Sequence, residues 1–318
     1  SLVIGAASLL AVGLAQQALW LIPLVVLIGA TNNFWHPAAI SYLSQCYPNN
    51  RGYALSIHTL GASIGDTVAP LVAGATLAWL SWQGTSSLLS LPVFAIAALL
   101  LIGLKAAGRE NGLNGDEGSG ISGYFNSVAA LVRDRAVIWL CAMAGFRSVA
   151  QSGLLVFLPL YLVNVLEVSP LVLGLAVMSM QIGAMIAGPA AGIASDRIGR
   201  QPVTLACLTA ATLMLVILTL VEGIVLFIAV VFLLGLAVFA ARPVIQSWAL
   251  DLAPEKMSGS VMSLLFGAQS AMSALIPLAG GLIADQWGIT AVFYVLATAM
   301  LIANVIVYFQ PHRAPAPE

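Results

Sequence analysis

Long apolar stretches separated by short polar breaks are the dominant pattern along this chain. The stretches are filled with Leu, Ala, Val and Gly, and they lack the polar and apolar alternation of barrel strands. A helix that crosses a bilayer takes about 20 apolar residues. The pattern predicts ten helical spans, at residues 2–15, 21–46, 51–79, 85–104, 136–165, 170–194, 202–220, 224–250, 258–284 and 289–309. We therefore predict an all-α, polytopic membrane protein.

The composition agrees with this pattern and excludes several classes of function. Of the 318 residues 61% are hydrophobic and 7% charged, whereas a soluble domain has about 25% charged residues. The 11 basic and 12 acidic residues include no basic block, which argues against nucleic-acid binding. Cys46, Cys141 and Cys207 lack the spacing of a disulfide framework or a zinc site. The sequence contains no HExxH motif, no paired carboxylates and no phosphate-binding loop. We therefore expect that the protein binds no metal or cofactor and is not an enzyme.

The basic residues lie in alternate breaks, and this predicts the orientation. Nine of them fall in one set of loops or in the C-terminal tail, while the other loops contain only acids such as Glu167, Glu222 and Asp285. By the positive-inside rule the basic loops face the cytoplasm. We therefore expect a multi-pass protein of the plasma (inner) membrane with a cytoplasmic C-terminus.

Residues 105–135 differ from the rest of the chain, being rich in Gly, Asn and Ser and carrying eight of the 23 charged residues. This composition predicts a cytoplasmic linker between an N-terminal half with four spans, residues 1–104, and a C-terminal half with six, residues 136–318. Apolar residues at helical spacing from Ile121 to Val132 leave two interpretations open, an amphipathic helix on the inner leaflet or a cap against the bundle.

Landmarks of the first half recur in the second at a nearly constant offset of 205 to 207 residues. The pairs are Pro37 and Pro243, Pro48 and Pro254, Pro70 and Pro277, Gly74 and Gly281, and Trp82 and Trp287. Such parallel repeats occur in secondary transporters, which bind substrate between the halves near the bilayer midplane. The offset places counterparts of the spans at 136–165 and 170–194 before Ser1. We therefore expect ten helices of a twelve-helix protein, the alternative being a natural ten-helix protein.

A loop of the second half carries a recognisable motif. Gly192, Asp196, Arg197, Gly199 and Arg200 form the pattern G-x-x-x-D-R-x-G-R. On this motif the chain resembles the major facilitator superfamily. The runs FWHPAA at 34–39, RGYALS at 51–56 and GASIGD at 61–66 resemble its fosmidomycin-resistance-like branch. The resemblance implies a bundle of two pseudo-symmetric halves, of which this chain would hold helices three to twelve.

The resemblance also implies a function, secondary active transport of a small organic compound by alternating access, with proton-coupled efflux the leading expectation. Proton-coupled uptake of an organic anion or metabolite is the alternative, and a non-transporting membrane sensor is a remote one. We expect a monomer in the lipid bilayer, because the internal repeat supplies both halves of a transport pathway within one chain. Its expected partners are a small-molecule substrate and protons.

The motif loop is implied to be a gate that stabilises the outward-facing state; alternatively, Arg197 and Arg200 only set the topology. Physical reasoning adds two expectations. Gly192 should let two helices approach closely, and Asp196 should meet a helix N-terminus or a basic side chain.

Two arginines inside predicted spans are candidates for substrate binding, since an ionisable residue there is costly. Arg147 lies about 15 Å into its span, near the midplane, and Arg242 reaches a similar depth. Two fixed cations at one depth suit an anionic substrate, because arginine can bind a carboxylate or phosphate through two hydrogen bonds. The alternative is permanent pairing of each arginine, for instance with Asp66 or with helix-end carbonyls.

Asp66 is expected to lie deepest among the acids, about 22 Å along its helix. It is a candidate either for proton coupling or for a counter-ion role. His36 occupies the repeat position of Arg242 and is a candidate proton relay, with a satisfied imidazole beside a proline as the alternative.

Uncharged polar residues inside spans can complete a substrate site or cement helix pairs. The residues able to hydrogen-bond a substrate are Asn32, Asn33, Gln151, Gln181, Gln246 and Gln269, and of these we assign substrate contact to Asn33, Gln151, Gln181 and Gln246. Gln151 is the best of them, because it lies one helical turn from Arg147 on the same face.

Overall fold

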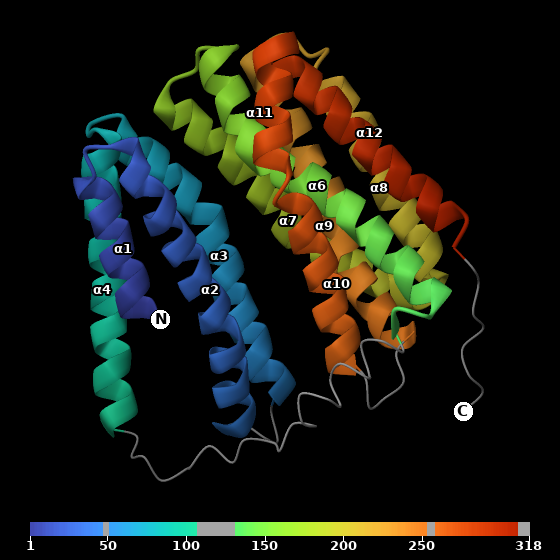
Figure 1. The fold of residues 1–318 in the computed structure, drawn as a ribbon, viewed down its shortest axis with the longest axis horizontal. Helices are drawn as coiled ribbons and strands as arrows, with labels where there is room; N and C mark the ends of the chain where they lie inside the picture. Colours follow the sequence, from blue (N-terminus) through green and yellow to red (C-terminus); the bar gives the residue numbers. More distant parts are fainter. Residues whose placement is uncertain (47–50, 107–130, 253–257, 311–318) are drawn as a thin grey trace. The chain divides into compact units, whose positions relative to one another are not determined.

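The computed structural model describes residues 1–46, 51–106, 131–252 and 258–310, and in these ranges all regular secondary structure is helical. The greater part of the predicted linker lies outside them. In the described part of the chain, eight helical segments are long and apolar enough to cross a membrane, one of them being Ser260–Trp287, and two shorter apolar helices are Leu2–Leu14 and Ala18–Thr31. In chain order (Figure 1) the helices are α1 (Leu2–Leu14), α2 (Ala18–Cys46), α3 (Arg51–Leu77), α4 (Trp82–Ala106), α6 (Arg135–Asn164), α7 (Pro170–Ile198), α8 (Arg200–Leu218), α9 (Ile224–Leu252), α10 (Ser258–Ser273), α11 (Ile276–Trp287) and α12 (Ile289–Tyr308).

The helices follow the predicted spans with one exception. The sequence predicts a single helix at 258–284, but α10 ends at Ser273 and α11 begins at Ile276. Pro277 is the second residue of α11 and has no N–H to donate to the carbonyl of Ser273, so the backbone ladder is interrupted at this point. The predicted span at 258–284 thus corresponds to the apolar segment Ser260–Trp287, but two helices form it instead of one.

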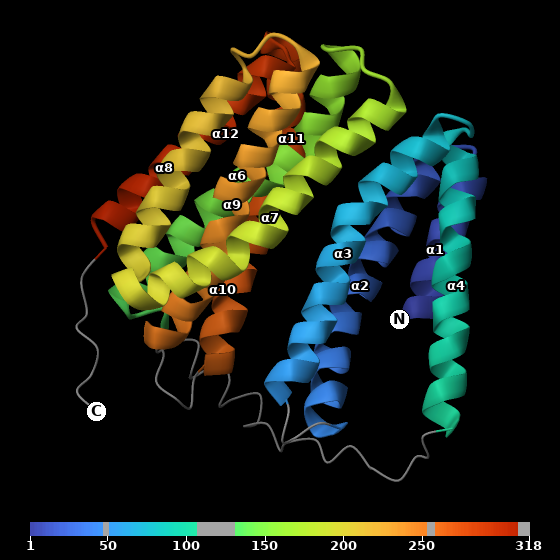
Figure 2. The ribbon, with the colours of Figure 1, turned by 180° about the vertical axis from the view of Figure 1, so that it is seen from behind.

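The described chain divides into two compact units. The first contains α1 to α4, in which α1 contacts α2 and α4, and α3 contacts the same two helices. The second contains α6, most of α7 and α8 to α12. In the second unit α6 lies against α10 and α12, and α8 lies against α9 and α12 (Figure 2). The repeat is visible in the helix bounds: α2 spans 18–46 and α9 spans 224–252, an offset of 206 residues at both ends.

Glycines bring α7 and α9 into backbone contact within the second unit. A Cβ added to Gly235 would lie 2.1 Å from the carbonyl oxygen of Met180, and one added to Gly183 would lie 2.4 Å from that of Phe232. Small residues permit such close crossings of membrane helices. Among the described residues, nothing lies within 4 Å of a Cβ added to Gly192. Within the second unit the close approach thus occurs nearer the middle of α7, and the one expected at Gly192 stays a prediction.

Helix α6 is the central helix of the second unit. Its buried residues run from Ala136 to Leu162 and occupy several faces, as expected for a helix enclosed by others. Tyr161 stacks on Phe227 of α9 and meets Phe293 of α12 edge to face, with ring centroids 5.7 Å and 5.3 Å apart. These contacts fix the rotation of α6 about its axis, and thereby the direction in which its polar residues project.

Candidate functional site

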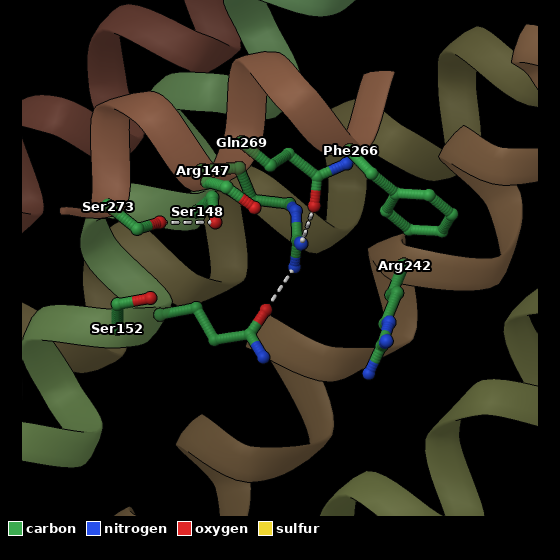
Figure 3. Close-up of a pocket in the computed structure, with 9 residues that line it drawn as sticks. Arg147, Ser148, Ser152, Arg242, Phe266, Gln269 and Ser273 are labelled. Atoms are coloured by element: carbon green, nitrogen blue, oxygen red, sulfur yellow. Dashed lines mark hydrogen bonds between the residues drawn. The ribbon is translucent and has the colours of Figure 1, made fainter. Parts of the chain in front are cut away.

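A polar cavity of about 250 Å³ lies within the second unit, between α6, α9 and α10 (Figure 3). Eight of its nine lining side chains are polar, none is acidic, and Phe266 is the single apolar one. The lining residues are Arg147, Ser148, Gln151 and Ser152 of α6, Arg242 of α9, and Phe266, Gln269, Ser270 and Ser273 of α10.

Helical spacing explains how these side chains come to share one cavity. The four residues of α6 are spaced i, i+1, i+4 and i+5, and the four of α10 are spaced i, i+3, i+4 and i+7, so each set forms one face of its helix. The two faces are joined by a hydrogen bond of 2.7 Å between the hydroxyl groups of Ser148 and Ser273. Two otherwise apolar helices therefore turn their polar stripes toward each other.

Arg147 is almost completely buried, with 2% of its side chain exposed. Its Nη1 donates to Gln151 Oε1 at 2.7 Å and to the carbonyl of Val238 at 3.3 Å, and its Nη2 makes a longer contact of 3.5 Å with Gln269 Oε1. Its Nε has no hydrogen-bond partner among the described residues. Among the described residues, neutral oxygens alone therefore solvate the charge of Arg147.

Arg242 supplies the second charge of the cavity. It is exposed on α9 directly before the internal Pro243, and it is close enough to Arg147 for the two guanidinium groups to repel each other electrostatically. Arg200 forms ion pairs with Asp196 and Asp251, whereas neither cavity arginine is paired with a carboxylate of a described residue. The cavity therefore concentrates positive charge, and an anion between the two arginines would relieve their repulsion.

The predicted substrate residues fall into two groups. Arg147, Gln151 and Arg242 come together as expected, and the hydrogen bond between Arg147 and Gln151 confirms that they share a helix face. Gln181 on α7 and Gln246 on α9 are half-buried but do not line the cavity.

The proton-coupling candidates all lie in the first unit. Asp66 is exposed near the middle of α3. The side chains of Asn33 and His36, both on α2, fall outside what the structure describes. Their roles in substrate binding and proton coupling therefore stay predictions.

Gln269, named from the sequence as a polar residue within a span, lines the cavity, whereas Ser270 and Ser273 beside it were missed. Their signal was present as a run of polar residues at helical spacing, Gln269, Ser270 and Ser273, in an otherwise apolar span. Serine and glutamine occur in many membrane helices as packing residues, so the spacing alone does not identify a cavity.

The motif loop lies at the junction of α7 and α8. Gly199 is the single residue between the two helices and has φ of +104°, a conformation that favours glycine. Arg200 donates from Nε to Asp251 Oδ2 at 2.9 Å, and from Nη1 to Ser195 Oγ at 2.7 Å and to Asp196 Oδ1. The expectation that Asp196 meets a basic side chain is confirmed. One arginine thus ties together the ends of α7, α8 and α9, while Arg197 is exposed.

Comparison with known proteins identifies the family. The family model described as Major Facilitator Superfamily matches residues 1–171 and 140–318. The multidrug resistance protein MdtG of Proteus mirabilis (strain HI4320) is 27% identical, over 96% of this chain and 75% of that protein. MdtG of Enterobacter lignolyticus (strain SCF1) is 24% identical, over 94% and 71%. The uncharacterized MFS-type transporter YuxJ of Bacillus subtilis (strain 168) is 24% identical, over 82% and 67%.

Solved structures agree on the fold. A bacterial homolog of the human lysosomal transporter Spinster, in inward-facing conformations, aligns with TM-scores of 0.73 (unoccupied) and 0.77 (occupied). The sequence identities are 16% and 14%, and the alignments cover 97% of this chain and 79% and 80% of the two solved chains. The family match extends over the whole chain, and the apolar helices are long enough to span a membrane. The chain therefore belongs to the major facilitator superfamily: it is a multi-pass membrane protein of a family of secondary transporters, and it is not an enzyme.

Proposed function

We propose that this chain exports a small organic anion across the plasma (inner) membrane in exchange for protons, by alternating access as a monomer with a cytoplasmic C-terminus. The observation that carries the proposal is the cavity containing Arg147 and Arg242 and no acidic residue. Relatives named as multidrug resistance proteins support export rather than uptake.

The charge of the cavity favours an anion. Removing a guanidinium group from water costs several kcal/mol, and a buried charge is stabilised best by an opposite charge with matched hydrogen bonds. Arg147 has neutral partners only among the described residues. A carboxylate or phosphate group would therefore gain both Coulomb attraction and charge-assisted hydrogen bonds, whereas a cation would be repelled.

The size of the cavity limits what this unit can hold. Pockets for drug-sized ligands are about 300 to 1,000 Å³, whereas this cavity has a volume of about 250 Å³. It therefore fits a compact anion or the charged end of a larger compound, and Phe266 offers an aromatic face for an apolar part of that compound.

Proton coupling requires a group that titrates within the membrane, and we assign this role to Asp66 with His36 as its relay. Asp66 is a carboxyl group within the apolar stretch Leu60–Leu77 of α3. Ionisable groups placed within spans commonly serve as proton carriers. The Arg200 network is the proposed gate, since its hydrogen bonds form only while the ends of α7, α8 and α9 adjoin.

The test is transport by the full chain in proteoliposomes under an imposed pH gradient. The substrates are radiolabelled benzoate, benzyl alcohol and benzylammonium, which share a ring and differ in charge. We expect proton-driven movement and counterflow of benzoate only. Equal transport of the neutral or cationic compound would refute the anion site, and absence of counterflow would refute alternating access. A gradient that drives benzoate in the same direction as protons would establish uptake in place of export.

A further inference from the structure

The orientation of two amide groups in the cavity is set by Arg147. Gln151 Oε1 accepts a hydrogen bond from its Nη1, and Gln269 Oε1 faces its Nη2. A guanidinium group has donors and no acceptor, so each amide must turn its oxygen toward Arg147 and its nitrogen away. Figure 3 shows the amide nitrogen of Gln269 directed away from Arg147.

The two amide nitrogens are available to a ligand. Both glutamine side chains line the cavity, and neither Nε2 group is hydrogen-bonded to a described residue. Arg147 is held in turn by the carbonyl of Val238 on α9, so the orientation is fixed from three helices. The cavity therefore presents N–H donors from α6 and α10 beside the exposed guanidinium group of Arg242.

We infer that Gln151 and Gln269 contact the transported anion directly through their Nε2 groups, and that Arg147 acts mainly as the positioning residue that orients them. The inference rests on the anion site proposed above and names its substrate class: a compound with an oxyanion group, of which several oxygens accept hydrogen bonds at once. Arg242 supplies the charge that meets the anion.

This arrangement meets two requirements of an anion site: several donors must converge on one ligand, and ligands that donate hydrogen bonds must be rejected. Neutral donors do not repel one another, so they can converge on one ligand without adding to the repulsion between the two arginines. They also discriminate by hydrogen bonding, because a ligand group that donates would face other donors. A carboxylate satisfies this geometry, whereas a carboxamide of the same shape brings its own N–H groups.

The test is binding of radiolabelled benzoate to the purified full chain in detergent, with benzamide as the neutral competitor. Gln269→Leu and Gln151→Leu each remove one donor and keep an apolar side chain of similar length. Each should raise the Kd for benzoate about tenfold or more, the effect of losing a hydrogen bond to a charged group. Gln269→Glu should weaken binding further, because its carboxylate would pair with Arg147 and repel the anion.

The matched control is Gln286→Leu, which alters an exposed glutamine of α11 outside the cavity and should leave the Kd unchanged. If Gln269→Leu is not monodisperse, the Kd of Gln269→Glu for benzoate tests the role of Gln269 instead. The inference would be overturned if the glutamine variants bound benzoate with the Kd of the wild-type protein. The proposed function would still stand in that case, provided that the wild-type protein bound benzoate more tightly than benzamide. Equal binding of benzoate and benzamide by the wild-type protein would overturn both.

Discussion

A methyl group added at Gly235 would test whether α7 and α9 are held at backbone contact distance. In Gly235→Ala the new Cβ would lie 2.1 Å from the carbonyl oxygen of Met180 and 2.8 Å from the carbonyl carbon. Real Cβ atoms essentially never come closer than 3.0 Å to another heavy atom. The contact is made to backbone, which cannot rotate away, so the two helices must separate by about 1 Å.

The cost of this separation can be worked from packing. Overfilling a well-packed contact costs about 1 to 3 kcal/mol, since dispersion contacts are lost along the whole crossing. A domain of this size loses about 2 °C of Tm per kcal/mol, so the Tm of Gly235→Ala should fall by about 2 to 6 °C. Gly183→Ala, whose Cβ would lie 2.4 Å from Phe232 O, should behave similarly. The double variant should lose less than the sum, because one separation relieves both clashes.

The assay is size-exclusion chromatography of the detergent-solubilised protein after heating, which gives the Tm of each variant. Gly281→Ala on α11 is the matched control, since nothing described lies within 4 Å of its added Cβ. It should match or exceed the wild-type Tm, because alanine favours a helix by up to about 1 kcal/mol over glycine. A Tm for Gly235→Ala as high as that of the control would refute the close crossing.

Three further changes address the cavity, the coupling acid and the gate. Arg147→Met should reduce benzoate transport at least about 100-fold, because it removes a positive charge from the cavity and leaves Gln151 and Gln269 without the group that orients them. Its Tm should be equal to or higher than that of the wild-type protein, because the variant lacks a desolvated charge. The same change at exposed Arg133 should alter neither quantity, and intact transport in Arg147→Met would contradict the anion cavity. Asp66→Asn should abolish accumulation driven by a pH gradient and spare counterflow, so unchanged accumulation would exclude Asp66 as the coupling acid. Arg200→Ala should lower the free energy of unfolding by only about 1 to 2 kcal/mol, since exposed ion pairs contribute about 0 to 1 kcal/mol each. It should nevertheless change the initial transport rate severalfold. An unchanged transport rate would mean that Arg200 only sets the topology.

Much of the fold could be predicted because the bilayer sets the length of an apolar helix. The contact between Arg147 and Gln151 was predictable for a similar reason, since residues four apart on one helix are always neighbours. The contact between Arg147 and Gln269 was not predictable in the same way. It depends on which faces of α6 and α10 turn toward each other, and the packing around Tyr161 and other distant residues decides that.

The helix break shows where sequence signals become ambiguous. Pro159 and Pro243 lie inside helices that stay continuous, whereas Pro277 follows a break. All three prolines remove the same backbone donor. Whether a helix bends or stops depends on how neighbouring helices satisfy the carbonyl left without a donor, and one sequence does not reveal those neighbours.

The break between α10 and α11 leads us to expect that α10 moves more readily than α6 and α9, the other two helices around the cavity. On either side of the break the chain has its own anchor on α6, Met272 against Gly145 and Gly280 against Phe157. Because no backbone ladder joins the two anchors, α10 can tilt without bending a helix. We expect α10, which carries Phe266 and Gln269, to adjust its position to ligands of different width, while Gln151 of α6 and Arg242 of α9 hold the anionic group in place. Such a site would be strict about the charge of a compound and tolerant of its shape.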